Sequence, residues 1–253
     1  MYTIDYNAYR TLKPYGKRVR FLVLHYTAQD FSESIKPLTT GTASAHYLIP
    51  DPTDSSYIAA GHKGQKIFNL VAEEDRAWHA GVSQWAGRSG LNDTSIGIEI
   101  VNQATDVDGV FTFPDYEVSQ ILALKQLAIN ILQRYPDMTP KNVIAHSDIA
   151  VGRKSDPGPK LPWKELAEAG IGAWYDDSVK HKYLRRFNCQ MPGREQVVEA
   201  FASYGYGIDA PASDVFFSAL VRAFQLHFRP ENYNGVLDAE TCAILYALNE
   251  KYA

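Results

Sequence analysis

The sequence predicts an α/β (α+β) fold in which helices flank a mixed central sheet, followed by a small C-terminal three-helix domain. Three observations support this prediction. Short runs that are continuously apolar, or that alternate apolar with polar residues, occupy the first half of the chain. One long segment with helical spacing follows them, and the last part of the chain holds three helical segments separated by Gly, Pro and Asn turns. Strands interleaved with one long helix indicate a mixed sheet covered by helices.

The expected strands come first, and two of them end at a histidine. The run FLVL at residues 21–24 is short and continuously apolar, as in a buried strand, and His25 follows it. The strand KNVIAH ends at His146 in the same way. In TSIGIEIVN, strict alternation puts three isoleucines on one face and Glu99 on the other. SAHYLIP, which carries His46, and GQKIFNLV complete the set of expected strands.

The main helix of the first domain is expected over residues 115–135. Apolar residues recur there three and four positions apart, and Pro136 ends the pattern. The stretch 173–191 is charged, non-periodic and followed by Pro-Gly, which is typical of a connection between domains. We therefore expect a first domain over residues 1–175, a linker over 176–192 and a helical domain over 193–253.

The composition argues against several classes of protein. With 253 residues, 45% of them hydrophobic and 21% charged, the chain has the composition of a folded globular protein. A formal net charge of −4 provides no positive field for nucleic acid. No run approaches the roughly 18 apolar residues of a membrane-spanning helix, and the amino terminus lacks the apolar core of a secretory signal. Cys189 and Cys242 are expected as unpaired, buried thiols, with one disulfide as the alternative.

Histidines are the main candidates for chemistry. The chain has seven: His25, His46, His62, His79, His146, His181 and His227. Zinc sites of hydrolases typically use three His, Asp or Glu ligands and leave one position open. His25 and His146 are favoured because rigid strand ends hold ligands accurately, with Asp148 or Asp156 as the carboxylate ligand. Spacing does not decide between the two aspartates, and each histidine by itself also fits an ordinary hydrogen-bonded residue.

Other kinds of active site have less support. Neither cysteine lies in the domain that holds the candidate histidines, which weakens a Cys-His nucleophile. The sequence contains no GxSxG elbow, no phosphate-binding loop and no dinucleotide fingerprint. His181 and His227 lie beyond the first domain and are expected at the surface.

Two parts of the chain resemble known families. Over about residues 18–165, five motifs occur in order: FLVLHYTA, SAHYLI, AWHAGVSQW, TSIGIEIVN and AHSDIAVGRKSDPGP. In these motifs the chain resembles the zinc-dependent N-acetylmuramoyl-L-alanine amidases of the AmpD-like family, which are related to phage amidases and peptidoglycan recognition proteins. The stretch LVRAFQLHFRPENYNGVLDAETCAILYAL is similar to a three-helix peptidoglycan-binding module, a shorter and less specific match. Together they imply the longer two-domain homologues that cut intact cell wall.

The amidase resemblance implies a specific ligand set. One zinc ion per chain is expected on His25, His146 and Asp156. Asp156 is chosen over Asp148 because the pattern of the family ends in K-x-D-P-G. Asp148 then takes the common role of an aspartate that structures a turn.

The same resemblance implies the catalytic and substrate-binding residues. Lys154 matches the catalytic lysine of the family, and Glu99 matches the acidic residue that faces the zinc-bound water. Zinc supplies hydroxide near neutral pH, while Lys154 stabilises the oxyanion. His46, Trp78 and His79 are placed at the cleft, for substrate contact or for support of the site.

The function implied is hydrolysis of the amide between N-acetylmuramic acid and L-alanine in peptidoglycan and muropeptides, which releases stem peptides. A non-catalytic peptidoglycan recognition protein and a zinc peptidase that cuts within the stem peptide are the alternatives. The substrate implies the periplasm, reached through a dedicated secretion system, with the cytoplasm as the alternative. A homo-oligomer and an inhibitor or immunity protein are partners that the sequence neither requires nor excludes.

Overall fold

The computed structural model describes residues 18–107, 110–208 and 212–252. Its strands are β1 (Phe21–Tyr26), β2 (Tyr47–Ile49), β3 (Phe68–Asn69), β4 (Gln84–Trp85), β5 (Arg88–Ser89), β6 (Ser95–Ile100), β7 (Thr105–Val107), β8 (Val110–Thr112) and β9 (Val143–Ala145). Its α-helices are α1 (Phe31–Thr40), α2 (Ser55–Ala59), α3 (Val118–Arg134), α4 (His146–Ile149), α5 (Trp163–Glu168), α6 (Asp177–Cys189), α7 (Arg194–Tyr204), α8 (Asp214–Phe228) and α9 (Ala239–Tyr252). Two 3-10 helices are η1 (Leu91–Asp93) and η2 (Pro140–Asn142).

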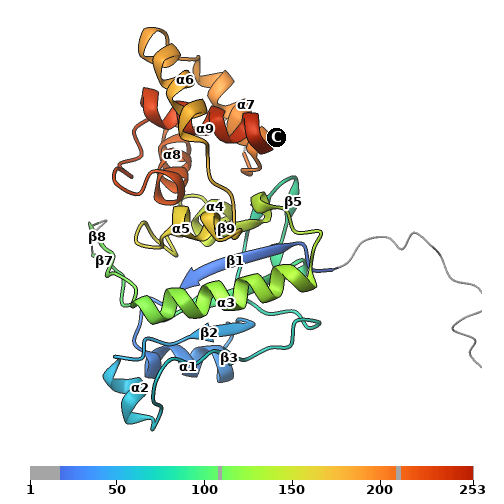
Figure 1. The fold of residues 1–253 in the computed structure, drawn as a ribbon, viewed down its shortest axis with the longest axis vertical. Coiled ribbons are helices and arrows are strands. Elements are labelled where there is room, and N and C mark those ends of the chain that lie inside the picture. The colour runs from blue at the N-terminus through green and yellow to red at the C-terminus, as the bar shows by residue number, and fades with distance from the viewer. Residues whose placement is uncertain (1–17, 108–109, 209–211, 253) are drawn as a thin grey trace, which may run out of the picture.

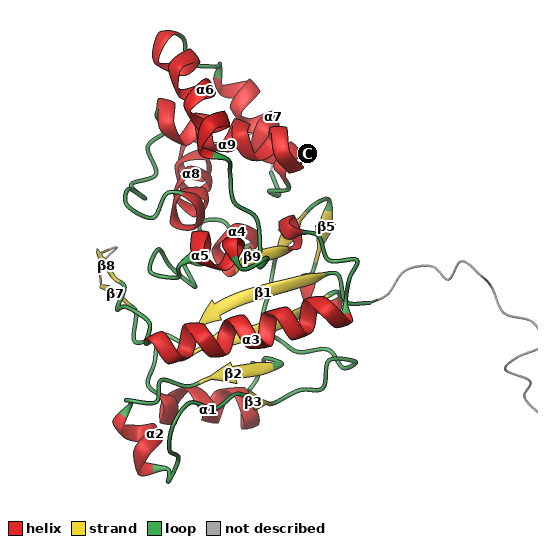
Figure 2. Ribbon diagram, in the orientation of Figure 1, coloured by secondary structure: helices red, strands yellow, loops and turns green. Residues whose placement is uncertain are grey.

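The central sheet is mixed, as predicted. Its strand order is β3-β2-β6-β1-β9, with β3 antiparallel to β2 and the other pairs parallel. Figure 2 shows β1 and β2 of this sheet in yellow on either side of the red helix α3. In this register His25 on β1 lies opposite Glu99 on β6, and Leu24 lies opposite Ala145, the last residue of β9. The carboxyl ends of the parallel strands therefore bring His25, Glu99 and the following His146 to the same edge.

The two faces of the sheet have different neighbours. One face carries the alternating isoleucines of β6 and packs against α3, the long helix that runs across the sheet in Figure 1. This cluster includes Leu22, Leu24, Ile96, Ile98, Ile100, Leu124, Ala128 and Ile131. The opposite face carries Phe21 and Val23 at the start of β1 and, by the same alternation, His25 at its end. This second face packs against the C-terminal helices at one end and forms the candidate site at the other.

Most of the segment expected as a linker is a helix. α6 packs against α9, where the ring centres of Phe187 and Tyr246 are 5.0 Å apart. Its apolar stripe is narrow, formed by Tyr183, Leu184 and Phe187, so the many charged residues conceal the helical period. The non-periodic interpretation of residues 177–189 is therefore wrong, whereas the three helices expected after residue 193 are confirmed.

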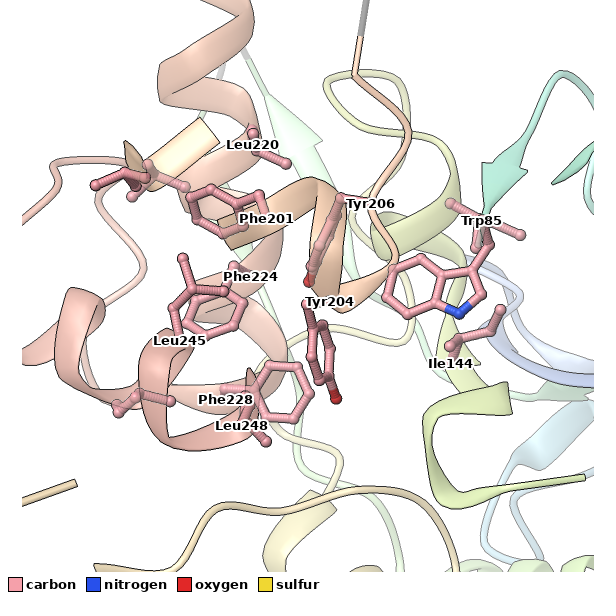
Figure 3. Packing of buried hydrophobic residues seen from close by; sticks show 14 of the residues in the cluster. Trp85, Ile144, Phe201, Tyr204, Tyr206, Leu220, Phe224, Phe228, Leu245 and Leu248 are labelled. Carbon is pink, nitrogen blue, oxygen red and sulfur yellow. The ribbon is translucent and has the colours of Figure 1, made fainter. Parts of the chain in front are cut away.

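The C-terminal helices and the sheet share one hydrophobic core. Trp85 of the β4–β5 hairpin packs edge-on against Tyr206 and Tyr204, with ring centres 4.9 and 5.9 Å apart. Ile144 of β9 and Phe224 of α8 belong to the same cluster, whose side chains meet across the two parts in Figure 3. The backbones of Trp85 and Tyr206 also form a bridge. The helices are thus an integral part of the core and not a tethered appendage.

Replacing Trp85 with alanine is expected to lower the free energy of unfolding by about 3–5 kcal/mol, the usual cost for a buried tryptophan. Trp85 is 1% exposed and fills the space between the two parts. Urea unfolding followed by circular dichroism measures the loss. Trp78→Ala is the matched control: at 58% exposure, it is expected to change stability by less than about 0.5 kcal/mol. Equal losses in the two variants would contradict a shared core.

The cysteines and the C-terminal histidines agree with expectation only in part. Cys189 and Cys242 are unpaired, as expected, but only Cys242 is buried. His181 is exposed, whereas His227 is buried, so the predicted surface position of His227 is wrong. Within the described ranges, no helix combines the length and apolar character needed to cross a membrane. Residues 1–17, where a secretory signal was considered, lie outside the described residues.

Candidate active site

Three side-chain atoms converge at the end of β1. Nδ1 of His25 lies 2.9 Å from Nδ1 of His146, and Oδ2 of Asp156 lies 3.0 and 2.9 Å from these two nitrogens. All three residues are buried. These are the three ligands that the resemblance implied, and the structure brings them together while Asp148 lies elsewhere, bonded to other partners.

Local structure explains how residues so far apart in the chain meet. His25 is held by β1, and His146 begins α4 immediately after β9, the neighbouring parallel strand. Asp156 arrives through the turn that follows α4. The backbone N–H of Ser147 donates to the carbonyl oxygen of Asp156 at 2.9 Å, so the second and third candidate ligands are joined through the main chain.

The ring of His146 is held in one tautomer. Its Nε2 lies 3.1 Å from the carbonyl oxygen of Ala80, which can only accept a hydrogen bond. Nε2 must therefore carry the proton, and Nδ1 is left with a free lone pair directed at His25 and Asp156.

A chain of hydrogen bonds fixes His25 in the same way. Ser95 donates its hydroxyl proton to the carbonyl oxygen of Leu91 at 2.6 Å, so its oxygen accepts from Nε2 of His79 at 3.0 Å. Nδ1 of His79 then accepts from Nε2 of His25 at 2.9 Å, which leaves Nδ1 of His25 unprotonated. Gly97 is required beside this chain because a Cβ there would lie 2.5 Å from the ring of His79.

The three converging atoms fit a cation. Two unprotonated nitrogens and a carboxylate oxygen within 3.0 Å of one another repel each other unless a positive ion lies among them. Burial lowers the pKa of His25 to about 4, with a further lowering from His146, which keeps the ring neutral. Burial alone would raise the pKa of Asp156, but the two histidines hold it well below its usual range. Two imidazoles and one carboxylate form a donor set typical of catalytic zinc.

The pKa of His25 predicts acid sensitivity of the zinc-free protein. Because its pKa falls from 6.5 to about 4 on folding, the unfolded chain binds more protons between these values. Stability is therefore lost as pH falls through this window, by about 3 kcal/mol in total. The pKa of Asp156 is also lowered, but the stability that it contributes is lost only below pH 3.8, the usual pKa of an aspartate.

Urea unfolding of chelator-treated protein at about pH 7 and about pH 5 measures this loss. His25→Asn removes one titrating ring and is expected to reduce the dependence on pH. Part of the dependence should remain, because burial also lowers the pKa values of His79 and His46. The same pH slope in the variant and the wild type would contradict the role of His25.

A cavity of about 370 Å³ opens beside the converging atoms. Its lining includes His146 and Asp156 together with Glu99, Lys154 and Trp78. The residues with predicted catalytic roles therefore border one space that can admit a substrate.

Glu99 has the properties of a proton-transferring group. Its Oε2 is closed off from solvent and has no hydrogen-bond partner within the part of the chain that the structure describes. Burial, with a contribution from the negative charge of Asp156, raises the pKa of Glu99 well above its usual range. A carboxyl group of this kind facing a cavity is typical of general acid-base catalysis. Lys154, two residues before Asp156, is exposed and borders the same cavity.

The three residues expected to bind substrate have different surroundings. Trp78 is largely exposed at the cavity, with the guanidinium of Arg76 stacked 4.3 Å from its ring centre. His79 reaches the cavity, but both of its nitrogens are engaged by His25 and Ser95. It therefore supports a candidate ligand.

His46 does not reach the cavity. It is fully buried, its Nδ1 accepts from the backbone N–H of Gly97 at 3.0 Å, and its Nε2 donates to the carbonyl oxygen of Asp75 at 3.2 Å. With both nitrogens occupied, His46 holds β6 in place, which fits support of the site, one of its two expected roles.

Sequence reasoning missed several contributors to the site. The carbonyl oxygen of Ala80 and the hydroxyl of Ser95 set the histidine tautomers, and the hydroxyl of Tyr26 lies 3.0 Å from Oγ of Ser155, beside Asp156. Ala80 and Ser95 fall within AWHAGVSQW and TSIGIEIVN, so the motifs contained a signal for them. Their roles depend on contacts with residues distant in the chain, which no local pattern records.

Known proteins share both the sequence and the fold of this chain. The Amidase_2 profile, described as N-acetylmuramoyl-L-alanine amidase, matches residues 15–159, more than half of the chain. The chain belongs to this amidase family. N-acetylmuramoyl-L-alanine amidase AmiD of Escherichia coli K12 is 44% identical over 238 residues, which cover 93% of this amidase and 84% of AmiD.

Solved structures extend the similarity to the whole chain. The crystal structure of AMPDH3 from Pseudomonas aeruginosa is 74% identical with a TM-score of 0.97, covering 100% of this amidase and 99% of AMPDH3. A second AMPDH3 structure, with a TM-score of 0.98, is a complex with anhydromuramic pentapeptide. AmiD in complex with the substrate anhydro-N-acetylmuramic acid-L-Ala-D-gamma-Glu-L-Lys is 41% identical with a TM-score of 0.85, covering 98% of this amidase and 97% of AmiD. The predicted fold class is confirmed, and this chain is an enzyme of the N-acetylmuramoyl-L-alanine amidase type.

Proposed function

We propose that this protein uses zinc held by His25, His146 and Asp156 to hydrolyse the amide between N-acetylmuramic acid and L-alanine in peptidoglycan and muropeptides, releasing stem peptides. The observation that carries the proposal is the convergence of the three lone-pair atoms. It lies at a cavity that His146 and Asp156 border together with Glu99. The ligands named for the AMPDH3 and AmiD complexes, which are anhydromuropeptides, support the same substrate class.

The side chains around the cavity have different roles in the proposed reaction. Zinc held by His25, His146 and Asp156 would supply Lewis-acid chemistry, which lowers the pKa of water toward about 7 and polarises a carbonyl group. Glu99 takes a proton from the attacking water and delivers it to the departing nitrogen of L-alanine, a cycle for which its raised pKa is suited. Lys154 donates to the carbonyl oxygen as it becomes negative; one such donor is worth about 2.7–4 kcal/mol in other hydrolases.

Two other functions fit the same residues less well. A non-catalytic recognition protein needs no complete ligand set, yet all three candidate ligands converge here, and two of them border one cavity with Glu99 and Lys154. A zinc peptidase that cuts within the stem peptide would use the same ligands. The family match and the names of the relatives favour the amidase.

Incubation of the purified protein with anhydro-N-acetylmuramic acid-L-Ala-D-γ-Glu-L-Lys, followed by mass spectrometry, tests this function. We expect release of the tripeptide that begins with L-alanine, loss of product after chelation, and recovery when zinc is restored. Cleavage inside the peptide would indicate the peptidase instead. Binding without cleavage would indicate the recognition protein, and turnover unaffected by chelation would contradict zinc dependence.

We also propose that the helical domain over residues 193–253, whose sequence resembles a peptidoglycan-binding module, adds affinity for the cell wall. A second contact with a polymer raises the effective concentration of the enzyme on its substrate. Because these helices share the core of the enzyme, truncation is not a clean test. Sedimentation of full-length Asp156→Ala protein with insoluble sacculi is expected to show binding without the metal centre. Absence of binding would contradict the proposal.

The substrate class supports action in the periplasm. We propose delivery there by a dedicated secretion system, with the cytoplasm as the alternative location. Fractionation of cells that produce the protein, with a cytoplasmic enzyme as the marker, distinguishes the two. Detection in the cytoplasm alone would contradict a periplasmic role.

A further inference from the structure

The carboxylate of Asp148 is buried and receives three hydrogen bonds. Its Oδ2 accepts from the backbone N–H of Ala145 at 2.9 Å and from Nδ1 of His227 at 2.7 Å. Its Oδ1 accepts from the hydroxyl of Tyr206 at 2.6 Å. Tyr206 and His227 belong to the C-terminal helical part, so two of the three donors come from outside the matched amidase segment.

The bond to Ala145 closes the turn that carries a candidate ligand. Ala145 ends β9 and caps α4, and His146 is the first residue of that helix. The turn also holds the backbone bond from Ser147 to the carbonyl oxygen of Asp156. Movement of Asp148 would therefore displace both His146 and Asp156.

The two donors are themselves held firmly. The ring of His227 stacks on the indole of Trp163 in α5, with centres 3.7 Å apart. Tyr206 packs against Trp85 and shares a backbone bridge with it. Both donors are nearly inaccessible to solvent. The contacts run from α5 and the β4–β5 hairpin, through Tyr206 and His227, to one carboxylate.

We propose that Asp148 is a positioning residue for the metal centre, and that Tyr206 and His227 make the C-terminal helices part of that centre. The inference rests on the proposed zinc site and goes beyond it. Metal affinity and turnover depend on ligand placement within about 0.5 Å, and partners one step removed from the ligands typically contribute 10–100-fold. The C-terminal helices thus have a second task besides wall binding.

Zinc affinity of the full-length protein, measured by competition with a chelator, tests this proposal. Asp148→Ala leaves the three donors unpaired and is expected to weaken zinc binding by about 10–100-fold. Tyr206→Phe, which removes only one hydroxyl, is expected to weaken it by up to about tenfold. In both variants kcat should fall with the muropeptide KM little changed, because neither residue lines the cavity of about 370 Å³. Asp148→Asn should retain most function, because its oxygen can accept from Ala145 and His227 while its amide donates to Tyr206.

Tyr252→Phe is the matched control. Its hydroxyl also joins the C-terminal helices to the rest of the chain, at the backbone of Trp174, but does not touch α4. We expect wild-type zinc affinity in this variant even if its stability falls. The proposal would be overturned if Tyr206→Phe and Tyr252→Phe had the same zinc affinity and the same kcat. If Asp148→Ala does not fold, this comparison alone tests the proposal. Failure of the wild type to bind zinc would instead refute the metal centre itself, and the positioning role with it.

Discussion

Replacing Asp156 with alanine is expected to abolish zinc binding and turnover together. Oδ2 of Asp156 lies within 3.0 Å of Nδ1 of both His25 and His146 and is the one anionic atom of the proposed ligand set. Without it, two neutral imidazoles remain to hold a divalent ion. Because loss of a partner behind a ligand already costs about 10–100-fold, we expect loss of the ligand to lower kcat/KM by more than about 100-fold. Zinc content by elemental analysis and muropeptide turnover measure the effect.

Asp115→Ala is the matched control for this experiment. Asp115 is exposed and forms a surface ion pair with Lys160, so its loss is expected to leave zinc content and turnover unchanged. Stoichiometric zinc and near wild-type turnover in Asp156→Ala would show that another residue completes the site. Comparison of unfolding curves separates loss of metal from loss of fold.

Replacing Glu99 with glutamine is expected to lower kcat by about 10²–10⁴-fold, the usual contribution of a general acid or base. The change preserves the size of the side chain and removes its ability to exchange a proton. Glu99 borders the cavity but is not among the three converging ligand residues, so zinc content and KM should change little. Steady-state kinetics over a range of pH, together with zinc analysis, measure the effect.

Two further variants sharpen the test of Glu99. Glu165→Gln neutralises an exposed glutamate paired with Lys125 and should leave kcat unchanged. Glu99→Asp keeps a titrating carboxyl on a shorter side chain and should recover part of the lost activity. Retention of the wild-type kcat and pH profile in Glu99→Gln would assign the proton transfers to another group.

Much of the fold was predictable because hydrophobic periodicity is a local property. Alternation in residues 94–102 indicated both the strand β6 and the opposite directions of its isoleucines and Glu99. The apolar run of β1 indicated a buried strand that ends at His25. α6 escaped prediction because its contact with α9 uses a narrow stripe in a charged segment.

The candidate site was predictable only in part. Strand ends pointed to His25 and His146, but the residues alone left Asp148 and Asp156 as equal candidates. The two aspartates are similar in chemistry and lie on the same loop. They differ in what surrounds them: Asp156 faces two unprotonated ring nitrogens, whereas Asp148 faces three hydrogen-bond donors.

By itself, the sequence determined the main strands of the sheet, the long helix α3, the three helices after residue 193, the class of fold and the motifs of the amidase family. Each of these is written in neighbouring residues. The tertiary structure decided that His46 is buried behind the site, that His227 is an interior residue, and that the C-terminal helices share a core with the sheet. These outcomes depend on contacts between segments far apart in the chain. The free energy of burying or pairing a side chain is set by those contacts and not by the local pattern.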